Sequence, residues 1–204
     1  MSEPLLSVCL ITYNHAKYIR QAIDGVLMQK VNFSWELIIA DDFSTDGTRE
    51  IVLEYKEKYP ESITLILQEK NVGAAKNFID LISAPSSKYV AYFEGDDYWV
   101  DPHKLQRQVD FLQSHPECVI CFHTTKVIYE GENKESTVYP TSVQREISTI
   151  EDLLTSSFIP SCSVVFRNGL VTEFPDWYFR SPIGDWPLYV LLAQFGSIGY
   201  VNGA

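Results

Sequence analysis

The chain has 204 residues, 46% of them hydrophobic and 13% aromatic, and a formal net charge of −11 at pH 7. This composition supplies a sizeable core and excludes an intrinsically disordered chain, and the length fits one domain over residues 1–204. The acidic charge argues against general binding to nucleic acid. An anionic substrate would need a local cation or a helix N-terminus to offset it.

The first half alternates strand-like apolar runs with helical apolar periodicity. Buried strands are expected at residues 6–12, 36–40, 63–67 and 88–93. Helices are expected at residues 16–29, between 46 and 60, through 78–82, and at 103–114. The pattern predicts an α/β fold in which a mostly parallel central sheet is flanked by helices. Ligands of such sheets bind beyond the carboxyl ends of the strands.

The rhythm changes after residue 115, where Gly and Asn separate two short apolar runs. This pattern favours an antiparallel hairpin, and shorter elements follow it. The expected elements are a strand at 118–129, a turn at 131–134, a return strand near 138, a helix at 149–155, a strand at 162–166, a helix at 184–195 and a strand from 198. We therefore expect a small antiparallel part beside the parallel sheet.

The N-terminus carries neither a targeting pattern nor a membrane span, because its apolar run breaks at Thr12, well short of about 20 residues. A cytoplasmic protein is expected, with attachment to the inner face of a membrane left open. Four cysteines fit a reducing compartment. Cys118 and Cys121 have a zinc-like spacing without a second pair. Residues three apart in a strand face opposite sides, so we expect both to be small buried hydrophobes.

Polar clusters follow the expected strands, at the edge where a parallel sheet binds ligands. The Asp96-Asp97 pair is either a solvated turn or a set of carboxylates for a hard cation such as Mg²⁺ or Mn²⁺. Asp42 can accept a hydrogen bond from a base N–H, whereas Ser44 and Asp46 fit the cap of the next helix. The clusters are Thr12-Tyr13-Asn14, Asp41-Asp42, Glu69-Lys70-Asn71 and Glu94-Gly95-Asp96-Asp97.

Four segments between residues 6 and 112 resemble family 2 glycosyltransferases of the GT-A fold in their order and spacing. They are SVCLITYNHAKYIRQAIDGVLMQ, WELIIADDFSTDGT, NVGAAKNF and YFEGDDYWVDPHKL. The resemblance implies an inverting, Mg²⁺- or Mn²⁺-dependent transferase that moves a sugar from a nucleotide-diphosphate sugar to a glycan or lipid-linked acceptor, in surface polysaccharide synthesis. It also implies a donor-binding half at residues 1–114 and an acceptor-side half at 115–204, shortened where the sequence ends.

The resemblance assigns roles at the matching positions. Asp42 would hydrogen-bond the base, Asp97 would bind the metal, and Asp96 would contact the ribose or donor sugar and share the metal. Glu94 stands where many members carry aspartate, so its role stays open. The implied nucleotide-binding residues are Thr12, Tyr13, Asn14, Asp42, Asn71, Gly73, Lys76 and Asp96.

The acceptor hydroxyl needs a base, and Asp185 in SPIGDWPLY resembles the acidic base motif of the family in its place along the chain. The alternative is that Asp185 only caps a helix, and Asp176 is the weaker competitor for the base. Trp177, Tyr178 and Trp186 either stack on the acceptor sugar or belong to the core.

Other classes of protein fit less well. A sugar-nucleotide pyrophosphorylase would need a Gly-rich loop where residues 13–18 contain no glycine. A phosphotransferase using Asp41 or Asp42 as nucleophile would need a differently arranged site, and a Rossmann dehydrogenase would need G-x-G-x-x-G. A non-catalytic nucleotide-sugar-binding module stays open. The histidines lack metal-ligand spacing, and a surface or loop role is expected for His15, His103, His115 and His123.

Overall fold

The computed structural model describes residues 3–131, 133–181 and 183–202. Its strands are β1 Leu6–Thr12, β2 Trp35–Asp41, β3 Ile63–Leu67, β4 Tyr89–Glu94, β5 Cys118–Phe122, β6 Thr125–Val127, β7 Thr137–Tyr139, β8 Ile147–Ser148, β9 Val165–Arg167 and β10 Ser197–Tyr200. Its helices are α1 Ile19–Leu27, α2 Thr48–Lys58, α3 Ala74–Ile82, α4 Lys104–Ser114, α5 Ile150–Thr155 and α6 Asp185–Leu192, with the 3₁₀ turns η1 Ser161–Ser163 and η2 Tyr178–Arg180. Glu132 of the expected turn and the last two residues lie outside the described part.

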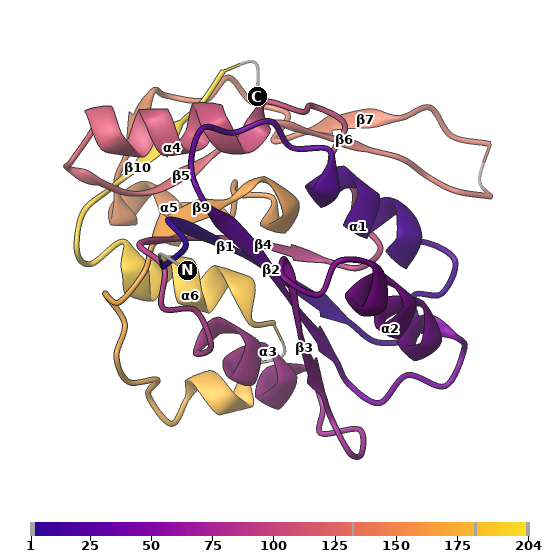
Figure 1. The fold of residues 1–204 in the computed structure, drawn as a ribbon. Coiled ribbons are helices and arrows are strands. Elements are labelled where there is room, and N and C mark those ends of the chain that lie inside the picture. Colours follow the sequence, from indigo (N-terminus) through magenta and orange to yellow (C-terminus); the bar gives the residue numbers. More distant parts are fainter. Residues whose placement is uncertain (1–2, 132, 182, 203–204) are drawn as a thin grey trace.

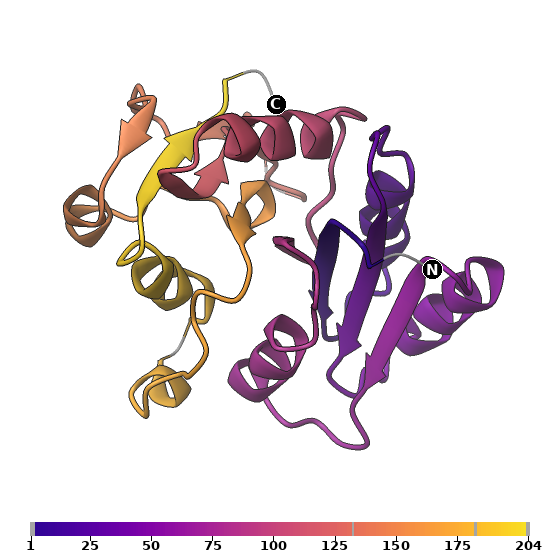
Figure 2. The same ribbon diagram turned by 60° about the vertical axis from the view of Figure 1, so that its left-hand side comes forward.

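The central sheet has the strand order β3-β2-β1-β4-β9-β5-β10-β8. Strands β1 to β4 pair in parallel, as the strand–helix alternation predicts, so the carboxyl ends of β1, β2 and β4 lie at one edge. Strand β9 runs antiparallel between β4 and β5 and joins the two halves of the chain. Figure 2 shows these halves next to each other, the first mostly in indigo to magenta and the second in rose through orange to yellow.

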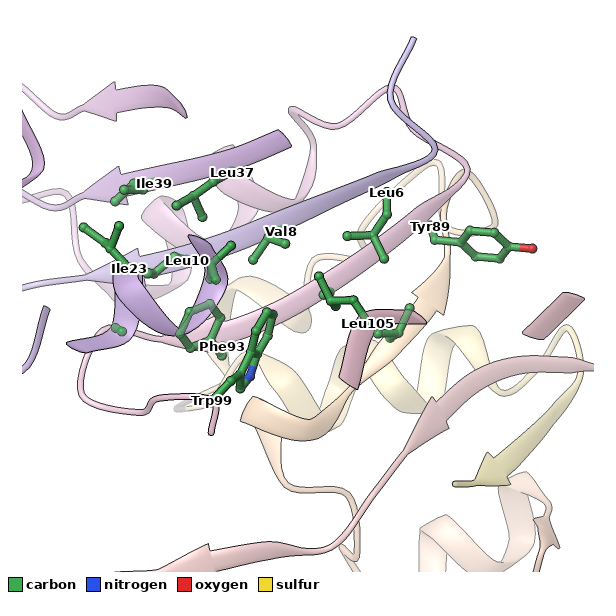
Figure 3. Packing of buried hydrophobic residues seen from close by; sticks show 14 of the residues in the cluster. Leu6, Val8, Leu10, Ile23, Leu37, Ile39, Tyr89, Phe93, Trp99 and Leu105 are labelled. Atoms are coloured by element: carbon green, nitrogen blue, oxygen red, sulfur yellow. The ribbon is translucent and has the colours of Figure 1, made fainter. Parts of the chain in front are cut away.

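Helices cover both faces of the sheet, as expected for α/β proteins. Figure 1 shows α1 and α2 on one side of β1 to β3, and α3 with α6 on the other. Alternate residues of β1 face the two layers, so Leu6, Val8 and Leu10 belong to one buried cluster and Cys9 to the other. Figure 3 shows the first cluster, in which the rings of Phe93 and Trp99 lie 4.6 Å apart.

The second half differs from the expectation in its details. The strand expected at 118–129 splits into β5 and β6, and β6 pairs with β7 as the predicted hairpin. The expected strand at 162–166 is instead the turn η1 followed by β9. Strand β8, two residues long, was not predicted because so short a segment carries no periodicity.

Cys118 and Cys121 are free and buried, as expected. The expectation that they face opposite sides of the sheet is wrong, since both belong to the cluster around Leu6 and Val8. Ser197 of β10 pairs with Cys118 and Ile198 pairs with Ile120, so Val119 is skipped in this pairing. The irregularity changes which residues of β5 share a face of the sheet, and Cys118 and Cys121 then lie on the same one. Burial raises the pKa of the Cys121 thiol to about 12.

Across the described residues, no helix combines the length and the apolar character that a bilayer crossing requires.

Candidate active site

A cavity of about 450 Å³ opens at the carboxyl ends of β1, β2 and β4, where ligands of parallel sheets bind. The first half of the chain contributes the strand ends and the start of α3, and the second half contributes the segment that leads into α6. The lining residues are Ile11, Thr12, Tyr13, His15, Asp42, Asn71, Gly73, Ala74, Ala75, Asn77, Phe78, Tyr92, Glu94, Tyr178, Ser181, Ile183, Gly184 and Asp185. Both halves are therefore needed to form one site.

The cavity gathers many of the residues that the sequence suggested, although they are far apart in the chain. The predicted site residues on its lining are Thr12, Tyr13, Asp42, Asn71, Gly73 and Asp185. Asn14, Lys76, Asp96 and Asp97 are not among the lining residues, and Asp176 is exposed elsewhere. The proposed base and the proposed base-binding carboxylate therefore share one cavity.

The two aspartates that end β2 have different environments. Asp41 is fully buried and accepts a hydrogen bond of 2.6 Å from Nε of Arg49, so it is a structural ion pair. Asp42 faces the cavity, where its carboxylate oxygens accept hydrogen bonds from the backbone N–H groups of Val72 (2.7 Å) and Gly73 (3.0 Å). These bonds fix the loop before α3 against β2. Each oxygen keeps a second lone pair for a base N–H.

Asn14 connects two loops at the mouth of the cavity. Its backbone N–H donates to Oγ of Ser44 at 2.9 Å, and its side-chain oxygen accepts from the backbone N–H of Thr45 at 2.9 Å. Its φ of 56° is left-handed, a conformation that asparagine tolerates better than most residues. Asn14 therefore positions the neighbouring Tyr13, whose side chain is 46% exposed beside the cavity.

His15 is a lining residue that the sequence reasoning placed only in a loop role. Its Nδ1 lies 3.3 Å from Oγ1 of Thr12, and its backbone N–H donates to Oγ1 of Thr48 at 2.8 Å. Gly95 is required beneath it, because a Cβ there would lie 2.8 Å from Oγ1 of Thr12 and 2.9 Å from Nδ1 of His15. The signal available in the sequence was only its position within the first strand-end cluster.

Acidic side chains concentrate at the turn after β4. A hydrogen bond of 3.1 Å from the backbone N–H of Asp97 to the carbonyl of Glu94 closes this turn. Burial raises the pKa of Glu94 to about 7, and the negative charges of Asp96, Asp97 and Asp185 add to the effect. Burial and Asp96 together raise the pKa of Asp97 to about 6. The structure thus brings the carboxylates of the turn and Asp185 into electrostatic contact.

This turn fits a divalent cation by the chemistry of its donor atoms. In the described ranges, no group of three or more His, Cys, Asp or Glu side chains is arranged to hold a metal. A hard cation such as Mg²⁺ commonly takes only one or two carboxylates and completes its coordination with water and substrate phosphates. Asp96 and Asp97 could supply those two carboxylates. Burial and the charge of Asp96 raise the pKa of Asp97, and a cation there would offset both.

Asp185 begins α6, and its backbone is held by aromatic neighbours. The hydroxyl of Tyr178 donates to the carbonyl of Gly184 at 2.5 Å. Gly184 lies so close to Phe78 that a Cβ would meet its ring at 3.1 Å. Phe78 in turn packs edge-on against Tyr92, with ring centroids 4.9 Å apart. This contact between α3 and the start of α6 positions Asp185 at the cavity.

The remaining predicted residues lie around the site. Lys76 forms an ion pair with Asp80 on an exposed part of α3, so its expected contact with a nucleotide stays a prediction. Trp177 is 46% exposed, whereas Trp186 is partly buried and its indole N–H has no hydrogen-bond partner in the described structure. Tyr178 is buried and takes part in the cavity wall.

The chain belongs to glycosyl transferase family 2, whose family model matches residues 7–172. Among curated relatives, Rv1520 of Mycobacterium tuberculosis, an uncharacterized protein, is 43% identical over 193 residues, which are 95% of this chain and 55% of that protein. The chain therefore spans about half the length of this relative.

Two further relatives have names that state a glycosyltransferase activity. The putative teichuronic acid biosynthesis glycosyltransferase TuaG of Bacillus subtilis is 38% identical over 201 residues, covering 97% of this chain and 76% of that protein. The Escherichia coli protein WfgD, a UDP-Glc:alpha-D-GlcNAc-diphosphoundecaprenol beta-1,3-glucosyltransferase, is 32% identical over 202 residues, covering 99% and 75%.

Solved structures show that the fold is GT-A. TarS of S. aureus, residues 1–349 in complex with UDP, is similar with a TM-score of 0.70 at 20% identity, covering 98% of this chain and 58% of that one. The mannosyltransferase PcManGT of Pyrobaculum calidifontis, in complex with GDP-Man and Mn²⁺, has a TM-score of 0.71 at 17% identity, covering 100% and 56%.

Proposed function

We propose that this chain transfers a sugar, with inversion at the anomeric carbon, from a nucleotide-diphosphate sugar to a saccharide hydroxyl. The observation that carries the proposal is that Asp42 and Asp185 line the same cavity of about 450 Å³. A volume of this order suits a small-molecule ligand of several rings. Membership of glycosyl transferase family 2 supports transfer over pyrophosphorolysis.

In this proposal the first half of the chain binds the nucleotide. Asp42 accepts a hydrogen bond from a base N–H with its free lone pairs, and the ring of Tyr13 stacks on the base. Asn71 and Gly73 form the wall beside the base, because Asp42 holds the loop that carries them. Thr12 lies at the carboxyl end of β1, on the lining next to His15.

Asp185 is the proposed general base. It lies at the second-half side of the cavity, where it would take the proton of the acceptor hydroxyl as that oxygen attacks the sugar. Asp96 and Asp97 are the proposed holders of Mg²⁺ or Mn²⁺, with Asp96 also near the ribose or donor sugar. When bound, such a cation neutralises negative charge on the departing nucleoside diphosphate. The Mn²⁺ complex of the PcManGT structure supports the choice of a divalent cation.

The acceptor we propose is a glycan or a saccharide linked to a lipid. The name of WfgD describes glucosyl transfer to GlcNAc-diphosphoundecaprenol, and the name of TuaG describes teichuronic acid synthesis. Both relatives support a role in surface polysaccharide assembly. A cytoplasmic location, with peripheral contact at the inner face of the membrane, follows from this acceptor class and remains part of the proposal.

Two measurements test the function. In a thermal-shift panel of UDP-, GDP- and dTDP-sugars, at least one should raise the Tm with Mn²⁺ and less without it, because a ligand that binds only the folded state stabilises it. Asp185→Asn should keep that shift while sugar transfer falls at least a hundredfold, and Asp176→Asn should leave both unchanged.

The outcomes separate the proposal from its alternative. A panel in which no nucleotide sugar raises the Tm in the presence of Mn²⁺ contradicts donor binding altogether. Stabilisation without transfer by the wild-type chain favours the non-catalytic nucleotide-sugar-binding module. Transfer that survives Asp185→Asn unchanged shows that another group removes the acceptor proton.

A further inference from the structure

The hydroxyl of Tyr189 is buried without a hydrogen-bond partner in the described residues, although its side chain is only 1% exposed. A buried polar group that lacks a partner is destabilising, and native proteins satisfy nearly all of them. An apolar residue of the same shape, phenylalanine, would avoid this cost. The retained hydroxyl of Tyr189 therefore indicates a hydrogen bond that forms only when a ligand is bound.

Helix geometry places Tyr189 beside Asp185. The two residues lie four apart in α6 and so share one face of the helix. Long side chains in helices point back toward the N-terminus, so the Tyr189 ring extends toward the turn that carries Asp185. The electrostatics agree with this placement. Burial raises the pKa of Tyr189 well above its ordinary value, and among its neighbours Asp185 adds most to the shift.

The Asp185 carboxylate lacks the complementary partner. Through residues 3–131, 133–181 and 183–202, no side chain or backbone N–H donates a hydrogen bond to it, although it lines the cavity. Tyr178, which is also near, already donates its hydroxyl to the Gly184 carbonyl. An unused donor and an unused acceptor thus lie one helical turn apart.

We propose that the Tyr189 hydroxyl is a positioning residue that hydrogen-bonds the Asp185 carboxylate when a substrate fills the cavity. The phenol stays protonated, so it can only donate to a carboxylate, and the bond restricts the rotation of Asp185. An oriented carboxylate would present its free oxygen to the acceptor hydroxyl. The role resembles that of any group that orients a base through a second hydrogen bond. It rests on the proposed function of Asp185.

The nearest competitor is the indole of Trp186, whose N–H is also buried and unpartnered. Residues at adjacent positions of a helix point in different directions, so Trp186 does not share the face of Asp185. Glu94 is a second acceptor that acts on the Tyr189 phenol, but more weakly than Asp185 does. The hydroxyl of Tyr92 already lies 3.5 Å from Oε1 of Glu94.

Tyr189→Phe tests the proposal, because it removes only the unpartnered oxygen. With the 204-residue chain, Mn²⁺, the nucleotide sugar that raises its Tm and a GlcNAc-diphosphate lipid, kcat should fall about tenfold, the loss of one good hydrogen bond. The donor KM should stay within about twofold. The Tm should be unchanged or higher, since the substitution removes an unsatisfied buried group.

Two control variants sharpen the result. Tyr55→Phe removes a hydroxyl that donates to Asp24 at 2.8 Å, away from the cavity, so it should lower the Tm and leave kcat unchanged. Trp186→Phe removes the competing unpartnered donor but keeps an aromatic ring, and at saturating acceptor its kcat should stay well above that of Tyr189→Phe.

The proposal is overturned if Tyr189→Phe keeps the wild-type kcat, or if it lowers the Tm as Tyr55→Phe does. It is also overturned if Trp186→Phe produces the same loss of kcat at saturating acceptor, where weaker stacking on the acceptor sugar would not lower the rate. A wild-type chain that transfers no sugar would overturn the proposed function instead. The Tm comparison would then still decide whether the Tyr189 hydroxyl is already used by the resting fold.

Discussion

Replacing Lys104 by methionine should stabilise the protein at neutral pH. Lys104 is only 1% exposed, its Nζ donates to Oε1 of Gln108 at 2.7 Å, and it lies 4.1 Å from the centre of the Trp99 ring. No carboxylate forms an ion pair with it anywhere in the described chain. Burial lowers its pKa from 10.5 to about 7. A buried cation without a counter-charge is costly to keep protonated.

The sign of the pH dependence of stability follows from the lowered pKa of Lys104. Between pH 10.5 and 7 the unfolded chain holds the Lys104 proton more tightly than the folded chain does, so the free energy of unfolding falls as the pH falls. At about 1.4 kcal/mol per pH unit, the whole window corresponds to about 5 kcal/mol. Methionine keeps the apolar stem but loses the bond to Gln108 and the contact with Trp99, each about 1–2 kcal/mol. We expect a net gain of about 2 kcal/mol at pH 7.

Urea unfolding of the wild type and Lys104→Met at pH 7, 8 and 9 measures this effect. The difference in unfolding free energy between the two proteins should shrink by about 1 kcal/mol for each unit of rising pH, because all other titrating groups cancel. A difference that stays constant from pH 7 to 9 would refute the reasoning. So would a variant less stable than the wild type at pH 7, since the cation would then be well solvated or paired in solution.

Two more substitutions test the frame of the site. Gly95→Ala should abolish most of the Tm increase caused by the nucleotide sugar. The new Cβ would lie 2.8 Å from Oγ1 of Thr12 and 2.9 Å from Nδ1 of His15, both on the cavity lining. An unchanged Tm increase would contradict this tight contact. Arg49→Met should lower the free energy of unfolding by about 3–5 kcal/mol in urea, because it leaves the Asp41 carboxylate buried and unpaired. A loss below about 1 kcal/mol would show that water reaches that carboxylate.

Strong local periodicity explains why the first half of the fold could be predicted. Strands β1 and β3 have the bounds expected from their apolar runs, and the helix after Asp46 begins at Thr48. Strand β8 was not predicted, and the strand predicted at 162–166 overlaps β9 only at its end. These two strands are only two and three residues long, and they exist because a neighbouring strand supplies their hydrogen bonds. Pairing between distant segments leaves no pattern within either one.

The candidate site, like the fold, has residues that the sequence could predict and residues that it could not. The places of Asp42 and Asp185 could be expected from the sequence, because Asp42 follows a predicted strand, Asp185 opens a predicted helix and both match motifs of the family. Both line the cavity. The different environments of Asp41 and Asp42 could not be predicted. Asp41 pairs with Arg49, whereas Asp42 accepts hydrogen bonds from the backbone of residues 72–73. His15 and Tyr189 were missed for a similar reason. The place of His15 on the cavity wall and the unpartnered hydroxyl of Tyr189 arise from contacts between segments that are distant in the sequence.

The charges of the cavity make the proposed cation central to donor binding. The described lining contains the carboxylates of Asp42, Glu94 and Asp185 but no lysine or arginine, and Asp96 and Asp97 lie in the turn after β4. Asp42 is compensated by two backbone N–H groups, whereas burial raises the pKa of Glu94 to about 7 and the negative charges of Asp96, Asp97 and Asp185 add to that shift. A free nucleoside diphosphate would add to that negative charge. Under the proposed function, nucleotide affinity must therefore depend steeply on the divalent cation, whereas an uncharged nucleoside, held only at the Asp42 end, must bind independently of it.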